Sequence, residues 1–65
     1  MHKQNEYDLE QIIDQEGLAD VLLAIAGICF GKAEHLRTNW QDHTMAKRWD
    51  SDGNKIHNLV AKLKN

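Results

Sequence analysis

The feature that most constrains this chain is a nearly continuous apolar stretch, LADVLLAIAGICF, which runs from Leu18 to Phe30 and carries one charge, Asp20. The stretch is too short to cross a bilayer, which needs about 20 apolar residues. It is also too apolar for an ordinary surface helix, which buries only one stripe. A chain of 65 residues has little else to cover such a helix. The sequence therefore predicts that a second copy of the chain, or another protein, covers it.

The small size of the chain favours the same conclusion. A single domain of 65 residues is expected to bury only about 60% of the surface that its unfolded form exposes. Burying that surface stabilises the fold by roughly 100 kcal/mol, and ordering the chain costs about the same amount. Cys29 is the only cysteine, so no disulfide within one chain can add stability. Oligomerisation is the remaining common way to stabilise a chain of this size.

Charge and cysteine content narrow the functional class. The formal net charge of −2 argues against a general binder of nucleic acids or acidic membranes. Cys29 lies inside the apolar stretch and is expected to be a buried, unreactive side chain. A lone cysteine is typical of a reducing compartment, and the N-terminal MHKQNEYDLE lacks the apolar segment of a signal peptide. We therefore expect a cytoplasmic protein.

The chain is predicted to be all-α. It contains no proline, and no segment alternates apolar and polar residues as a strand would. A short helix is expected at about 8–16, with Asp8 as its N-cap and Gly17 as its stop. Residues 1–6 are expected to be frayed. A second helix is expected at about 18–36, because its apolar residues recur every three or four positions.

A third helix is expected at about 39–64, with Thr38 as its N-cap and Gln41 three residues later in a capping box. Its continuity is the main ambiguity. The segment 51–54 has the composition of a turn, whereas the apolar residues keep a helical rhythm across it. Both a continuous helix and a break at 51–54 therefore stay open.

These elements predict one domain, residues 1–65, built as a helical hairpin with a short first helix. A hairpin leaves half of its apolar surface open, and two hairpins paired by a two-fold axis make a dimeric helical bundle. A compact three-helix monomer is the alternative. The side chains expected in the self-association interface are Leu22, Ile25, Cys29, Met45, Trp49, Ile56 and Leu59.

No catalytic, cofactor or metal site is predicted. Aligning Gly53 with the glycine of a calcium-binding EF-hand loop puts Arg48 and Leu59 where acidic ligands are needed. No two histidines are four residues apart, and no acidic residue has a histidine three residues later. We therefore expect a non-enzymatic protein.

Two functional hypotheses follow. The first is a protein–protein interaction or regulatory module that self-associates through apolar helix faces. The second is a weak nucleic-acid-binding regulator, because Arg48, Lys55 and Lys62 repeat at seven-residue spacing and share one stripe if the third helix is continuous. Trp40 is expected to cover the corner between the second and third helices, where it would pack on Leu36.

Overall fold

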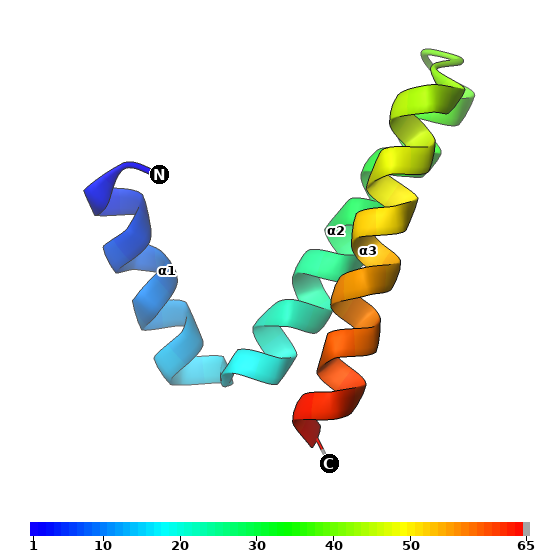
Figure 1. The fold of residues 1–65 in the computed structure, drawn as a ribbon. Coiled ribbons are helices and arrows are strands. Elements are labelled where there is room, and N and C mark those ends of the chain that lie inside the picture. The colour runs from blue at the N-terminus through cyan, green and yellow to red at the C-terminus, as the bar shows by residue number, and fades with distance from the viewer. Residues whose placement is uncertain (65) are drawn as a thin grey trace.

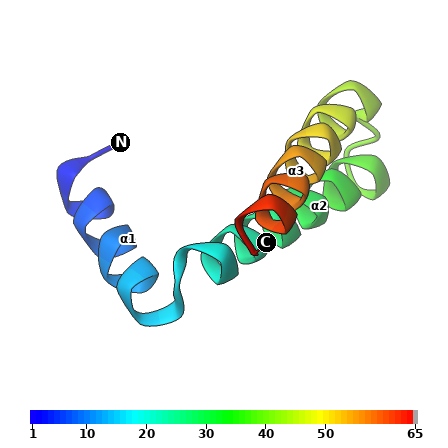
Figure 2. The ribbon, with the colours of Figure 1, turned by 60° about the horizontal axis from the view of Figure 1, so that its bottom comes forward.

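The computed structural model describes residues 1–64, which form three helices in the order α1 (Lys3–Glu16), α2 (Leu18–Thr38) and α3 (His43–Lys64). The described residues contain no strand, so the all-α class and the hairpin are confirmed. Helices α2 and α3 lie antiparallel and pack along their length, while α1 diverges from them at the α1–α2 corner (Figure 1). The view in Figure 2 shows the same separation between α1 and the hairpin.

Helix α1 begins earlier than the expected Asp8. Residues 3–7 include lysine, glutamine and glutamate, which all favour helix. The amide of Gln4 donates to the Asp8 carboxylate at 3.1 Å, and the amide of Gln11 donates to the Tyr7 hydroxyl at 3.0 Å. Asp8 therefore lies inside the helix instead of capping it. Of residues 1–6, which were predicted to be frayed, only Met1 and His2 lie outside the helix.

Gly17 ends α1 and begins α2. Its φ of 90° is a conformation that residues with a Cβ rarely adopt. Its backbone N–H donates to the Ile13 carbonyl at 2.7 Å, and its carbonyl accepts from the Val21 N–H at 3.1 Å. One residue thus serves both helices, and the sharp corner sends α1 away from the hairpin.

The corner between α2 and α3 differs from the prediction of Thr38 as an N-cap. Thr38 is the last residue of α2, and its hydroxyl donates to the Glu34 carbonyl at 2.9 Å. Asp42 caps α3 instead, because its carboxylate accepts the Met45 N–H at 3.1 Å. Gln41 has a φ of 51°, so it cannot be the helical third residue of a capping box. The third helix therefore begins at His43 and not at residue 39.

Trp40 does not cover this corner. The side chain is 70% exposed, and its indole N–H donates to His35 Nε2 at 3.1 Å. Asn39 reaches the other ring nitrogen of His35 at 2.7 Å. The indole is thus held outside the helix pair by a hydrogen bond to α2.

Helix α3 is continuous through the turn-like segment 51–54. Gly53 explains why this composition is tolerated: it is buried, and a Cβ at this position would lie 2.8 Å from Cε1 of Phe30. The glycine is therefore a point of close helix approach and not a helix stop. The residues buried with it along the line of contact, here called the seam, are Ala26, Cys29, Ala33, Ala46 and Val60.

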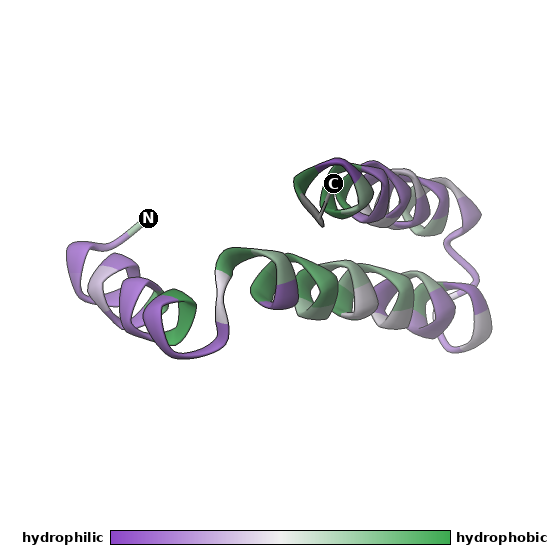
Figure 3. Ribbon diagram, turned by 90° about the horizontal axis from the view of Figure 1, so that it is seen from below, coloured by the Kyte–Doolittle hydropathy of each residue, from purple (hydrophilic) through white to green (hydrophobic). Residues whose placement is uncertain are grey.

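The three helices form a single thin layer. The Cα atoms extend over 37 × 31 × 14 Å, and α1 packs on α2 without reaching α3 in the described residues. A single layer leaves both of its faces open, so the core is limited to the seam and to Val21. Figure 3 shows apolar residues concentrated in the first turns of α2 and a largely polar α1. No helix among residues 1–64 combines the length and the apolar character needed to cross a membrane.

Candidate interaction surface

The seam is built mainly from small residues, and the larger apolar side chains lie beside it. In α3, Met45 precedes Ala46 by one position, which turns it about 100° around the helix. In α2, Ile25 is displaced from Ala26 in the same sense. Because α2 and α3 are antiparallel, equal displacements from the seam put both side chains on the same face of the hairpin. We call this the open face. It comprises Leu18, Ile25 and Leu36 of α2 together with Met45, Trp49, Ile56, Leu59 and Leu63 of α3.

Most of the predicted interface residues lie in the seam or on the open face. Cys29 is buried in the seam. Met45 and Leu59 are 38% and 46% exposed. The remaining predicted residues are half-buried, so the hairpin covers one side of each and leaves the other accessible; they are Leu22, Ile25, Trp49 and Ile56.

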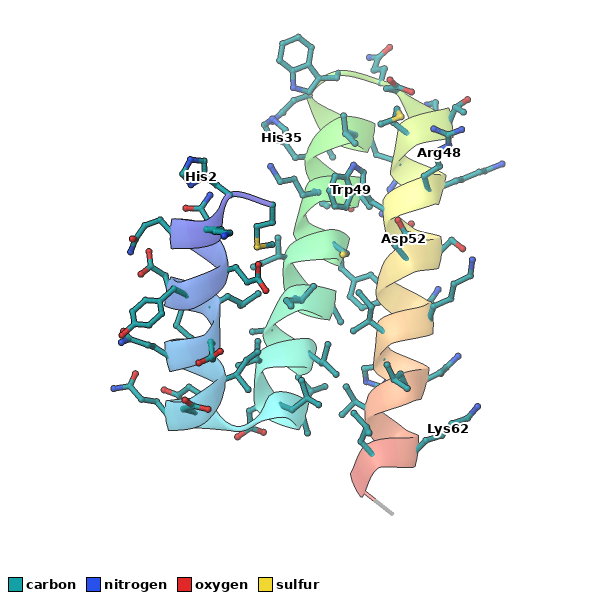
Figure 4. The ribbon with its side chains drawn as sticks, turned by 60° about the vertical axis from the view of Figure 1, so that its left-hand side comes forward. His2, His35, Arg48, Trp49, Asp52 and Lys62 are labelled. Atoms are coloured by element: carbon teal, nitrogen blue, oxygen red, sulfur yellow. The ribbon has the colours of Figure 1, made fainter. Side chains whose placement is uncertain are left out.

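Figure 4 shows the open face toward the viewer. Trp49 lies between the α2 and α3 ribbons in this view, and its side chain is half-buried. Asp52 lies on the same face and is exposed, so the apolar surface is divided by one acidic side chain. An interface that uses this face must leave Asp52 in contact with water or with a basic group.

The exposed area measures how incompletely the fold is covered. A compact protein of 7.5 kDa is expected to expose about 4,200 Å². This chain exposes 5222 Å². The excess of about 1,000 Å² is close to the ~800 Å² that each partner contributes to an interface of standard size. The described residues also include no large side chain that is fully buried.

The three basic residues of the predicted stripe lie along the outer edge of α3. Arg48, Lys55 and Lys62 are all exposed, and the continuity of α3 aligns them about 180° from the seam. Figure 4 shows Arg48 and Lys62 pointing away from α2. We call this the basic edge.

Arg37 makes the ion pairs found among residues 1–64. Its guanidinium donates to the Asp50 carboxylate at 2.6 Å across the seam and to Glu34 at 3.3 Å along α2. The hydrogen bond to Asp50, with a smaller contribution from Glu34, raises the pKa of Arg37 above its ordinary value. Because the pKa is raised, the stabilisation that this ion pair gives to the fold is fully present below the ordinary pKa of arginine. It is lost only as the pH rises from that ordinary pKa through the raised one. Arg37 is therefore a permanent positive charge that links α2 to α3 through Asp50, and not a pH switch.

No pocket is found, and no group of three histidine, cysteine or acidic side chains is placed to hold a metal ion in residues 1–64. The Cys29 thiol is buried in the seam, away from solvent. The open face and the basic edge carry most of the predicted interaction residues and are the candidate sites.

The sequence analysis predicted residues of a self-association interface and did not identify the small residues that make most of the contact between α2 and α3. The signal that could have found the seam is the seven-residue spacing of Ala46, Gly53 and Val60, which places three residues on one line of α3. Apolar periodicity alone favoured Met45, Trp49 and Ile56. These residues lie beside that line, on the open face of α3.

Comparison of the chain with protein families, with curated proteins and with solved structures found no match to any of the three.

Proposed function

We propose that this protein is a small non-enzymatic interaction module that pairs with a second copy of itself through the open face, as a two-fold homodimer. The observation that carries the proposal is the excess exposed area of a single-layer fold, about 1,000 Å². Two layers stacked face to face would enclose the apolar side chains that one layer leaves open. A homodimer with two-fold symmetry is the commonest closed assembly.

The side chains on the open face are of the type that drives association. Trp49 and Met45 belong to residue classes enriched in interfaces. Leu59 and Leu63 are 46% and 48% exposed, which is unfavourable for leucine in an isolated monomer. Pairing would remove these surfaces from water and add to the small stability expected of a chain of this size.

The test is the mass in solution, measured by light scattering on a sizing column over a wide concentration range. A stable mass near twice 7.5 kDa is expected. Leu59→Asp should shift the chain toward monomer, and because Leu59 is exposed the hairpin itself should stay folded. Asn58→Asp is the matched control, since it adds the same charge one position away from the open face.

A second variant on α2 keeps the test independent of α3. Ile25→Asp should dissociate or unfold the assembly. Ala24→Asp should leave the dimer intact, because Ala24 is exposed and lies two positions before Ala26, on the edge of α2 that faces away from the seam. A monomeric wild-type chain at all concentrations would overturn the proposal. So would dimers of unchanged affinity in both Leu59→Asp and Ile25→Asp.

The alternative function is weak binding of nucleic acid along the basic edge. The observation that favours it is the alignment of Arg48, Lys55 and Lys62 on one exposed line of α3. Duplex binding by these residues should collapse between low and physiological salt. It should also be lost in the variant that combines Arg48→Glu with Lys55→Glu. Unchanged binding in that variant would exclude the basic edge as its site.

A further inference from the structure

Helix α1 is the least covered element of the fold. None of its residues is buried, and it packs on α2 at one end of the layer. Figures 1 and 2 show it diverging from the hairpin, so that α1 and the hairpin together form an open V. Apolar Leu9 and Ile13 are half-buried, while Ile12 is 48% exposed. In a single chain, therefore, few contacts fix the position of α1 relative to the hairpin.

Charge separates the two edges of the layer. Helix α1 carries five acidic residues against one lysine, a net charge of −4. Helix α3 carries five basic residues against two acidic ones, a net charge of +3. The two helices do not pack on each other in residues 1–64, and neither the acids of α1 nor the basic edge takes part in an ion pair there. The complementary charges of one chain thus do not meet within that chain.

Two-fold symmetry brings these edges together in only one of two ways of stacking the layers. An axis parallel to α2 and α3 brings α1 of one copy to the side of the layer where α3 of the other copy lies, with α2 over α2. An axis across the helices lays α1 over α1 and α3 over α3, which opposes like charges. Like charges brought together across an interface are unfavourable, and complementary ones fix its register.

We propose that α1 of each copy lies along the basic edge of the partner copy, so that the dimer has its two-fold axis parallel to the helices. This inference rests on the proposed self-association and specifies its geometry. It assigns a role to the two features that the hairpin leaves unexplained, the divergent acidic helix and the basic edge.

The spacing of the charges suits such a contact. Glu6, Glu10 and Asp14 recur every four residues and therefore share one side of α1 over about 12 Å. The basic edge from Arg48 to Lys62 extends over about 21 Å at the same rise per residue. The acidic side of α1 is thus short enough to lie within the length of the basic edge.

The experiment uses charge-reversed full-length chains and measures dimer dissociation constants at low and physiological salt. The first variant combines Glu6→Lys with Glu10→Lys, and the second combines Lys55→Glu with Lys62→Glu. Each should form its own homodimer about ten-fold more weakly than wild type at low salt, because a pair of attractive contacts becomes repulsive on both sides of the axis. Mixed together, the two variants should form a heterodimer tighter than either homodimer.

A fourth chain controls for overall charge. The variant that carries all four substitutions has the net charge of wild type, −2, and should regain wild-type affinity. Homodimers of unchanged affinity in both double variants, with no preference for the mixed pair, would overturn this geometry and leave the open-face dimer standing. A wild-type chain that is monomeric throughout would overturn both proposals. Loss of duplex binding by the Lys55→Glu and Lys62→Glu variant, with dimerisation unchanged, would overturn this geometry and assign the basic edge to nucleic acid.

Discussion

The hairpin and α1 both carry apolar side chains at helical spacing, yet they reach very different degrees of burial. The hairpin brings its axes together with alanine and glycine, and Ala33 and Ala46 are both completely buried. Helix α1 offers Leu9, Ile12 and Ile13 on one stripe and has no buried residue at all. The difference shows that apolar periodicity predicts a helix, whereas burial depends on whether a partner helix can approach.

Close approach explains why the hairpin can exist without a third covering element. Small side chains let two helices approach and gain dispersion contacts along their whole length. Asp50 and Arg37 add a 2.6 Å ion pair across the same seam. Helix α1 has neither a line of small residues facing α2 nor an ion pair to α2 in residues 1–64. Contacts within one chain therefore do little to fix α1 against the hairpin.

The strongest way to break this contrast is to enlarge a seam residue. Ala33→Leu should destabilise the hairpin by about 3 kcal/mol, because the new side chain has no space between the helices. Ala24→Leu is the matched control: Ala24 is exposed on the same helix, and its replacement should change the free energy of unfolding little. Urea unfolding followed by circular dichroism measures both. Equal effects at the two positions would contradict the assignment of the seam.

A smaller and local effect is expected at the joint between α1 and the hairpin. Gly17→Ala puts a Cβ on a residue with φ of 90°, which costs about 2 kcal/mol. Because no residue of α1 is fully buried, the chain can relieve this strain by fraying α1 and leave the seam intact. Amide hydrogen exchange should therefore show faster exchange in α1, with α2 and α3 unchanged. Equal loss of protection in all three helices would mean that α1 is an integral part of the core.

Features of the fold that depend on local sequence could be predicted, whereas features that depend on contacts between helices could not. The class, the number of helices and the hairpin were predictable, because they depend on local composition and on apolar periodicity. The position of the α2–α3 corner was not, because Thr38 and Asp42 are both competent caps and the choice depends on the backbone of Gln41. Gly53 has the sequence context of a turn, and it is a packing residue only if the third helix is continuous; the structure shows that it packs against Phe30.

The smallest effect distinguishes glycines that permit packing from glycines that do not. A Cβ at Gly27 would find open space within 4 Å, whereas one at Gly53 would lie 2.8 Å from the Phe30 ring. Gly27→Ala should stabilise the protein by about 1 kcal/mol through helix propensity alone. Gly53→Ala gains the same helix propensity, but displacing Phe30 costs as much or more, so the net effect on stability should be zero or destabilising.

Thermal unfolding at several protein concentrations measures the effects of both substitutions. The stability gained at Gly27 should persist in the dimer only if the partner copy lies on the open face. A Gly27→Ala variant that dimerises more weakly would instead place the partner on the Gly27 side of α2.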